Sequence, residues 1–141
     1  MSNTDLMNAI SISSYGMRAQ SARMRVISEN MANSETAAVA PGEDPYLRKI
    51  VTFKNQLDRE LGVNVVSIDK IRQERGTEPL PTQFMPDHPG ADENGYVQMP
   101  NVDPLTEVVD MREAQRSYEA NLGMIEQARN MILQTIDLLR G

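Results

Sequence analysis

A seven-residue apolar repeat runs through the C-terminal stretch of the chain, residues 104–141, and constrains the fold more than any other feature. With Val108 as position a of the heptad, the a positions are Val108, Gln115, Leu122, Arg129 and Ile136, and the d positions are Met111, Tyr118, Ile125, Ile132 and Leu139. Eight of these ten side chains are apolar or aromatic. A repeat sustained over this length is typical of a coiled-coil seam rather than of an ordinary amphipathic helix.

The flanks of this stretch predict where the helix begins and ends. Asp103 is a favourable N-cap, Pro104 suits the first helical turn, and Gly141 closes the chain. A helix over residues 104–140 spans roughly 55 Å, whereas a compact domain of this chain length has a radius of gyration of about 14 Å. The helix must therefore project from a globular body or pair with a partner of similar length.

A second apolar row follows another face of the same predicted helix. It consists of Met124, Met131 and Leu138, again seven residues apart. A helix with two apolar faces is expected to contact more than one neighbour. Polar residues at a positions commonly set register or partner choice in coiled coils, and we expect that role for Gln115 and Arg129.

A weaker repeat occupies the N-terminus and predicts a second helix over residues 1–33. Ser2 and Asp5 have capping-box spacing, and a row of apolar residues recurs every seven positions at Ile10, Met17, Met24 and Met31. Ser13 and Gln20 interrupt the face beside that row. Because the two predicted helices have similar lengths, we expect them to pair as a coiled coil, with Arg23 and Arg25 close to Glu119 and Glu126.

The middle of the chain, residues 34–103, has the composition of a small β-containing insert. Alternating and β-branched residues predict strands over 46–53, 63–71 and 96–99, while 55–62 is ambiguous. The Pro- and Gly-rich segment 74–95 is expected to lack regular structure. The fold class is therefore mainly α with a small β insert, organised as 1–33, 34–103 and 104–141.

Composition excludes several functions. The net charge is −6 and no Lys/Arg cluster is present, which argues against nucleic acid and against an anionic membrane surface as partners. The absence of Cys excludes disulfides and thiol catalysis. No stretch is apolar enough to insert in a membrane, and the N-terminus does not have the pattern of a secretory signal peptide.

Few residues suggest chemistry. His88, the single His, lies with Asp87 and Asp92 in a Pro/Gly-rich loop, where turn formation explains these residue types better than metal binding does. We expect no catalytic, cofactor-binding or metal site. Two readings remain open for Asn30, Asn33 and Thr36, which suit either contacts with another subunit or the capping of the first helix.

Three stretches resemble members of one known family. The first is ENMANSET at residues 29–36, the second is DHPGADENGYV at 87–97 running on to PNV at 100–102, and the third is EAQRSYEAN at 113–121. The first resembles the motif near the N-terminus of bacterial flagellar axial proteins. The second and third are similar to flagellar basal-body rod proteins, in particular to proximal-rod subunits, and the resemblance covers nearly the whole chain.

This resemblance implies a structural subunit of the periplasmic rod, the hollow drive shaft that transmits torque from motor to hook. The implied partners are other copies, other rod proteins, the MS ring with its rod-base adaptor region, and the flagellar type III export apparatus, which would export the chain without a cleaved signal. The predicted seam and Asn30, Asn33 and Thr36 are the candidate subunit contacts. The alternatives are a coiled-coil adaptor or chaperone of an export system, and a metal-dependent enzyme built around His88.

Overall fold

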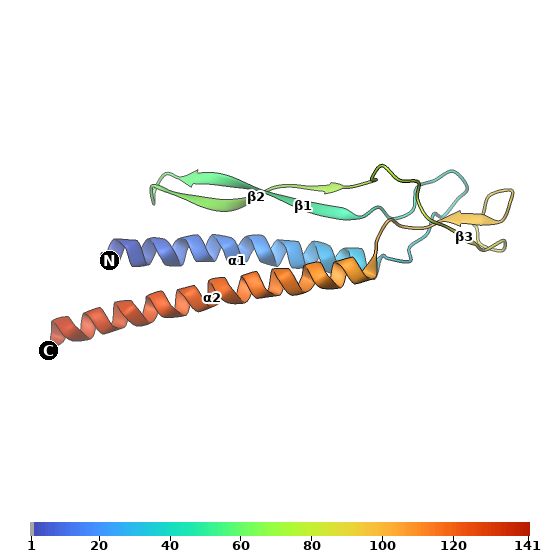
Figure 1. Ribbon diagram of the computed structural model, residues 1–141. Helices are drawn as coiled ribbons and strands as arrows, with labels where there is room; N and C mark the ends of the chain where they lie inside the picture. Colours follow the sequence, from blue (N-terminus) through green and yellow to red (C-terminus); the bar gives the residue numbers. More distant parts are fainter. Residues whose placement is uncertain (1) are drawn as a thin grey trace. The chain divides into compact units, whose positions relative to one another are not determined.

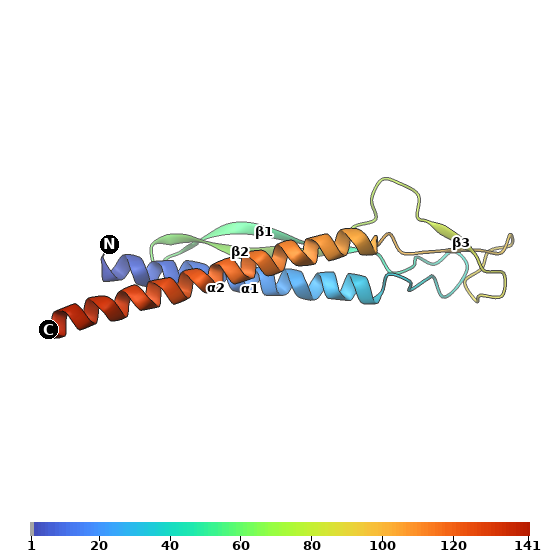
Figure 2. The same ribbon diagram turned by 60° about the horizontal axis from the view of Figure 1, so that its bottom comes forward.

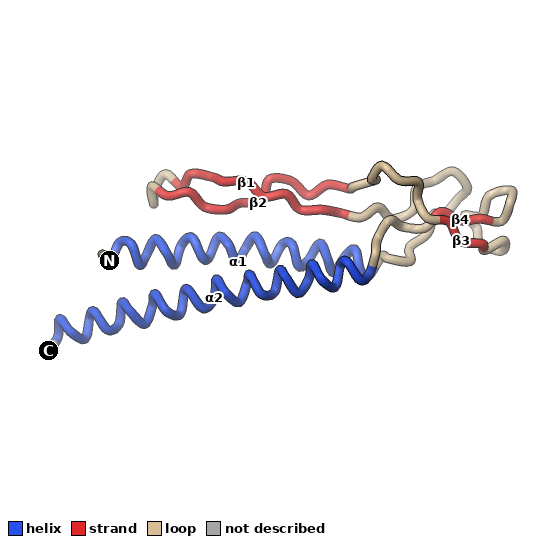
Figure 3. The backbone as a smooth tube through the Cα atoms, in the orientation of Figure 1, coloured by secondary structure: helices blue, strands red, loops and turns tan. Residues whose placement is uncertain are grey.

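The computed structural model describes residues 2–141 (Figure 1). In chain order the elements are α1 (Asn3–Ala32), β1 (Lys49–Asp58), β2 (Val63–Gln73), β3 (Thr82–Phe84), β4 (Tyr96–Gln98) and α2 (Pro104–Arg140). Figure 3 shows the helices and strands in separate colours. Helices of 30 and 37 residues hold about half of the chain, and the strands form two small sheets, β1–β2 and β3–β4. The predicted class, mainly α with a β insert, is confirmed.

The chain divides into two compact units, and each is built from parts distant in sequence. Unit 1 comprises the residues up to Met24, Val51–Lys70 and Arg112–Gly141, and unit 2 comprises Arg25–Ile50 and Ile71–Met111. Each unit thus contains part of both helices and part of the β1–β2 ribbon.

The predicted helix starts are confirmed by their capping contacts. Ser2 N donates to Asp5 Oδ2 at 2.9 Å and Asp5 N donates to Ser2 Oγ at 3.2 Å, which is the reciprocal capping box. At α2, the backbone N–H of Leu105 donates to Asp103 Oδ1 at 3.2 Å, and the hydroxyl of Thr106 donates to Asp103 Oδ2 at 2.6 Å. These carboxylates also lie at the positive ends of the helix dipoles.

The end of α1 differs from the expectation in its mechanism. The helix ends at Ala32, and within residues 2–141 no residue other than glycine has a positive φ. Asn33 therefore does not adopt the left-handed conformation that asparagine tolerates. Its side chain instead donates from Nδ2 to the carbonyl of Glu29 at 2.9 Å, a carbonyl that also accepts the backbone N–H of Asn33 at 3.1 Å.

In unit 1 the β1–β2 ribbon and α2 lie on different sides of α1, as Figures 1 and 2 show. The hydroxyl of Tyr15 on α1 donates to Asp58 Oδ2 at the end of β1, at 3.1 Å. The core is thin, and Ala19 of α1 and Val65 of β2 are among its few fully enclosed residues. Short side chains let the ribbon approach the helix closely.

The strand predictions need three corrections. β1 starts at Lys49 and not at position 46, and it continues through the first half of the ambiguous stretch to Asp58. After β1, Gly62 has φ +66° and donates from its N–H to the carbonyl of Asp58 at 2.8 Å, which turns the chain into β2. β2 runs beyond its predicted end at position 71 and ends at Gln73. Strand ends are set by pairing between the strands, which periodicity does not report.

The third correction falls in unit 2, where the expectation of no regular structure in 74–95 was wrong. β3 pairs antiparallel with the correctly predicted β4, with the register Thr82↔Gln98, Gln83↔Val97 and Phe84↔Tyr96. Pro81 and Pro86 flank β3 and leave its three residues free to pair. Val97 is 0% exposed, so its side chain packs within unit 2, whereas its partner Gln83 is exposed.

Candidate subunit-interface site

A fully hydrogen-bonded asparagine side chain lies inside unit 2. Asn30, near the end of α1, is 1% exposed. Its Oδ1 accepts the N–H of Lys49 at 2.9 Å and the hydroxyl of Tyr46 at 2.8 Å, and its Nδ2 donates to the carbonyl of Lys49 at 2.8 Å and to Glu107 Oε2 at 3.2 Å. The amide pairs with Lys49 as a neighbouring strand would, and its whole hydrogen-bonding capacity is used.

A buried carboxylate beside Asn30 binds an arginine. Glu107, in the first turn of α2, is 0% exposed and accepts Arg48 Nε at 2.5 Å. Arg48 also donates from Nη2 to Asp110 at 3.1 Å and from Nη1 to Glu74 at 3.5 Å. A carboxylate without access to water remains charged only with such partners. The Arg48 network, meaning Asn30, Arg48 and Glu107 with these contacts, therefore joins α1, β1 and α2 within unit 2.

The electrostatics of this network favour the charged form of Arg48 and the neutral form of Tyr46. Burial alone lowers the pKa of Arg48, but its hydrogen bond to Glu107 and the charges of Glu107, Asp110 and Glu74 raise the pKa above its ordinary value. Burial, followed by the charges of Glu29 and Glu107, raises the pKa of Tyr46. The guanidinium therefore stays charged and the phenol stays neutral.

In unit 1 the two helices approach each other through small residues. A Cβ atom added to Gly16 of α1 would lie 2.9 Å from the side chain of Asn121 of α2. Ala114 and Ala128 of α2 are buried at 0% and 4% exposure, and Ile125 lines a hollow with residues of α1. Small side chains at such a crossing let two helix backbones come close together.

The face of α2 that packs within the chain is therefore shifted from the predicted seam. Of the predicted d residues in unit 1, Leu139 is 84% exposed, whereas Tyr118, Ile125 and Ile132 are partly buried. Their companions in the inner row are not the a residues but the positions just before them, Ala114, Asn121 and Ala128. Spacings of three and four residues link these six positions, so the heptad period holds with a different choice of second row.

The predicted a residues of unit 1 lie on the surface of the described chain. Leu122 is 40% exposed and Ile136 41% exposed, while Gln115 and Arg129 are also exposed. Val108, in unit 2, is partly buried like Met111. On α1 the predicted row divides similarly, since Ile10, Met17 and Met24 are partly buried and Met31 is 36% exposed. Arg23 contacts Glu113 at 3.4 Å, a partner that was not expected from the sequence.

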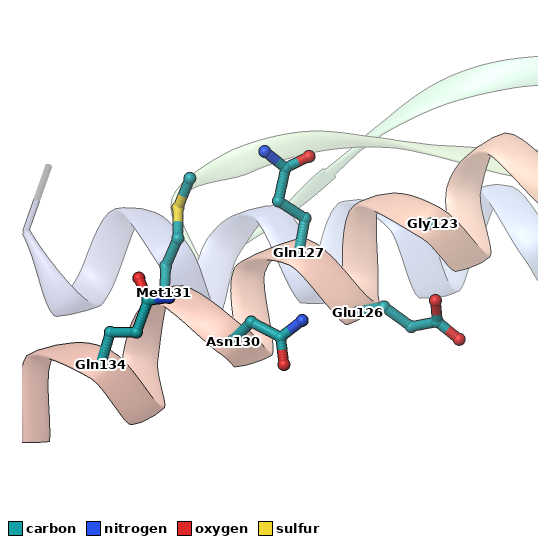
Figure 4. A pocket seen from close by; sticks show the side chains of 6 residues that line it. All are labelled: Gly123, Glu126, Gln127, Asn130, Met131 and Gln134. Carbon is teal, nitrogen blue, oxygen red and sulfur yellow. The ribbon is translucent and has the colours of Figure 1, made fainter. Parts of the chain in front are cut away.

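The outward surface of α2 in unit 1 is arranged as two apolar rows beside a polar face. Leu122, Leu133 and Ile136 form the first row, and Met124, Met131 and Leu138 form the second, all at least 37% exposed. The polar side chains between the rows line a shallow hollow over Gly123, shown in Figure 4: Glu126, Gln127, Asn130 and Gln134, with Met131 at its edge. All of them belong to one helix, so the hollow is a gap left by the missing side chain of Gly123.

The structure separates the roles of Asn30, Asn33 and Thr36. Asn33 and Thr36 make the local contacts of a helix end, with the Thr36 hydroxyl donating to Asn33 Oδ1 at 3.1 Å. Asn30 does neither of the two things considered for it, because its partners are distant parts of the same chain. The polar side chain beside it, Glu107, was not among the candidate residues.

The loop around His88 is organised by turn contacts. His88 Nδ1 accepts the N–H of Gly90 at 3.0 Å, and Asp92 Oδ1 accepts the N–H groups of Asn94 and Tyr96 at 2.8 Å and 2.9 Å. Over residues 2–141 no group of three or more His, Cys, Asp or Glu side chains is placed to hold a metal ion. The loop's polar side chains thus serve its backbone.

Arg48, Tyr46 and Glu107 were missed by the sequence reasoning. Arg48 and Glu107 are 59 residues apart in the chain, and neither belongs to a motif with a fixed spacing. Glu107 also lies next to an a position, where a charged residue normally flanks a seam in water. The only hint in the sequence was that Tyr46 and Asn30 each lie at the end of a predicted element. That position does not indicate that the two side chains touch.

The comparisons with known proteins agree with one another. The family model described as flagellar basal body rod FlgEFG protein C-terminal matches residues 93–138. Flagellar basal-body rod protein FlgC of Agrobacterium fabrum is 47% identical over 94% of each chain. The proteins of the same name from Aquifex aeolicus and Salmonella typhimurium are 36% and 34% identical, and each match covers 94% of this chain.

Two long helices joined by a β insert, together with these matches, define a flagellar basal-body rod protein, which is a structural class. At this identity and coverage, the chain belongs to the family of flagellar basal-body rod protein FlgC. It is a structural subunit of the flagellar rod, and its place is the basal body. Among residues 2–141, neither helix is apolar and long enough to cross a membrane.

Proposed function

We propose that this subunit assembles into the proximal rod through the two outward apolar rows of α2. One observation carries the proposal: six large apolar side chains at heptad-related positions lie at least 37% exposed on one helix of unit 1. Exposed apolar rows of this length are a characteristic of interaction surfaces. The first row also explains why sequence periodicity favoured the a positions, whose side chains in unit 1 lie on the surface, whereas three of the d residues pack within the chain.

The occupants that we propose for these rows are helices of other copies and of other rod proteins, paired as coiled coils. Leu122 and Ile136 would supply the apolar contacts, and the exposed Gln115 and Arg129 in the same row would select register. Asn33 and Thr36, which follow the end of α1, remain candidates for contacts with another subunit in addition to their local hydrogen bonds. Met31 is 36% exposed and is a further candidate for a contact with another subunit.

The finer parts of the function are proposals as well. The subunit would lie near the MS ring and its rod-base adaptor region, transmit torque as part of a hollow shaft, and reach the periplasm through the type III export apparatus without a cleaved signal. The sequence resemblance to proximal-rod subunits supports this placement. The structural class of the family supports a role without catalysis.

The test places a charge in the first row without disturbing the inner face of α2. Leu122→Asp and Ile136→Asp should give purified protein with unchanged helicity, because these side chains are already 40% and 41% exposed. Cells carrying them should produce the protein but yield no rod on basal-body purification, since an unpaired charge would be buried at every repeat of the interface. Swimming should be lost with the rod.

Asn130→Asp is the matched control, because it adds the same charge on the polar face of α2 between the rows. Cells with this variant should assemble rods and swim. Normal rods in Leu122→Asp and Ile136→Asp cells would show that the first row faces solvent in the assembly. Disordered purified variants would show that the row packs within the chain.

A further inference from the structure

We propose that the β3–β4 ribbon in unit 2 is a docking surface for a Lys/Arg-bearing segment of a neighbouring protein subunit. We call its outward face the aromatic finger, formed by Phe84 and Tyr96 with the acidic residues Asp87, Asp92 and Glu93 in the connecting loop. The inference rests on the assignment as a rod subunit and adds a second contact, on a different unit from the apolar rows of α2.

The first observation is an exposed aromatic pair. Phe84 is 61% exposed and Tyr96 46% exposed, although the whole chain has only 4 Tyr and 2 Phe. The two rings are directly paired across the ribbon, with centroids 5.4 Å apart at 64°. Because alternate pairs face opposite sides, Val97 packs on unit 2 and this pair faces outward. Burying Val97 alone would not require aromatic residues at its neighbours.

The second observation is that the pair is supported by contacts within the ribbon. Gly95 has φ +83°, and a Cβ atom there would lie 2.9 Å from the Phe84 ring and 3.2 Å from Pro86 Cβ. The Phe84 ring therefore lies against the backbone of Gly95 with the edge contact of Tyr96 at its side. Binding loses little side-chain entropy at such a site, and preordered aromatic residues are typical of interaction hot spots.

The third observation is the charge around the pair. Residues 76–100, which contain the β3–β4 ribbon, include no Lys or Arg, whereas they include Glu78, Asp87, Asp92 and Glu93. Asp92 is held beside Tyr96, since its Oδ1 accepts the Tyr96 N–H at 2.9 Å, and Asp87 and Glu93 are exposed in the same loop. An exposed aromatic pair whose connecting loop is acidic matches a guanidinium or ammonium group, which stacks on the ring and is attracted by the carboxylates. The partner segment is therefore basic.

The test cross-links the finger to its neighbour in assembled basal bodies. Gln98 is exposed and lies on the same side of the ribbon as Tyr96, so a photoreactive benzophenone amino acid at position 98 leaves both aromatic rings intact. After irradiation, basal bodies are purified and the cross-linked peptide is identified by mass spectrometry. The expected product joins position 98 to a peptide of another subunit that contains Lys or Arg close to the cross-link.

Variants separate the contribution of the rings from that of the charges. Phe84→Ala should reduce the cross-link yield by about tenfold or more, as expected for a hot-spot residue, and Asp87→Asn with Glu93→Gln should reduce it while leaving the Asp92 turn intact. Val39→Ala, which truncates an apolar side chain that is 74% exposed in the same unit, is the control and should leave the yield unchanged.

The peptide is identified in the chain with native aromatic residues, so the result does not depend on any variant assembling. A cross-link to a segment without Lys or Arg, a yield unaffected by Phe84→Ala in assembled basal bodies, or no cross-link in cells that swim would each overturn the docking proposal. Swimming cells without a cross-link would leave the α2 rows as an assembly surface, which keeps the two proposals distinguishable.

Discussion

The Arg48 network allows a test of buried charge: removing the charges of both Arg48 and Glu107 should destabilise the folded protein less than removing the charge of Arg48 alone. Arg48→Met leaves Glu107 at 0% exposure without its cation, and breaking a buried pair in this way costs about 3–5 kcal/mol. The side chains of Asp110 and Glu74 are 27% and 43% exposed, so water replaces their contacts with Arg48 and adds little to the cost.

Glu107→Gln should be milder. Asn30 Nδ2 and Arg48 Nε donate to different oxygens of Glu107, so the single amide oxygen of Gln keeps only one of these two hydrogen bonds, and the guanidinium keeps Asp110 and Glu74 as partners. The loss is that of a charge-assisted hydrogen bond, about 1.5–3 kcal/mol. In the double variant Arg48→Met with Glu107→Leu, no charge remains buried, and the main loss is the acceptor for one Asn30 donor, about 1–3 kcal/mol.

Urea unfolding of the purified proteins, followed by far-UV circular dichroism, measures these differences. The double variant should unfold at a higher urea concentration than Arg48→Met alone, and Glu107→Gln should fall between Arg48→Met and the native protein. With Glu107→Leu measured as the second single variant, a double variant that loses the sum of the losses of Arg48→Met and Glu107→Leu would refute the reasoning. It would mean that Glu107 is not desolvated in solution and that the two residues act independently.

Two further outcomes follow from the helices. Ile125→Asp should lower the stability of the purified protein and abolish the rod, because Ile125 packs against α1. Gln127→Asp, on the outward polar face, should change neither. Equal urea midpoints for the two variants would contradict the inner row assigned to α2. The hydrogen bond from the Thr106 hydroxyl lowers the pKa of Asp103 below its ordinary 3.8, and the backbone N–H of Leu105 lowers it further. The Asp103 carboxylate therefore stabilises the folded state above that pH, and this stabilisation is lost as the pH falls through the lowered pKa. In thermal unfolding, the native protein should have a higher midpoint than Asp103→Asn at neutral pH, and the difference in midpoint should shrink at strongly acidic pH. A difference in midpoint that grew on acidification would contradict this prediction.

The helices followed from the sequence because their determinants are local. Capping by Ser2, Asp5 and Asp103 depends on residues within one turn, and heptad spacing depends only on the helical period. Both helix starts and the α2 end were predicted this way. The family resemblance arose from short motifs that likewise need no tertiary information.

The choice of the inner helix face was decided by the tertiary structure. Sequence periodicity weighs side-chain size and favoured Leu122 and Ile136, but the described chain packs Ala114, Asn121 and Ala128 inward. Close approach to Gly16 leaves room for small side chains only. Leu122 and Ile136 remain outside, where a partner is required to cover them, while Tyr118, Ile125 and Ile132 are partly buried, so one repeat contains both an internal and an external surface.

The Arg48 network was also beyond the reach of the sequence. Asn30 lies in a motif whose spacing suggested capping, and Asn33 does cap α1, but the partners of Asn30 come from β1 and α2. Glu107 is charged and reads as exposed until the chain places Arg48 against it. Local patterns therefore determined which segments are helical, and contacts between residues distant in the chain determined which polar side chains are buried, because a charge is stable inside a protein only once its partner arrives.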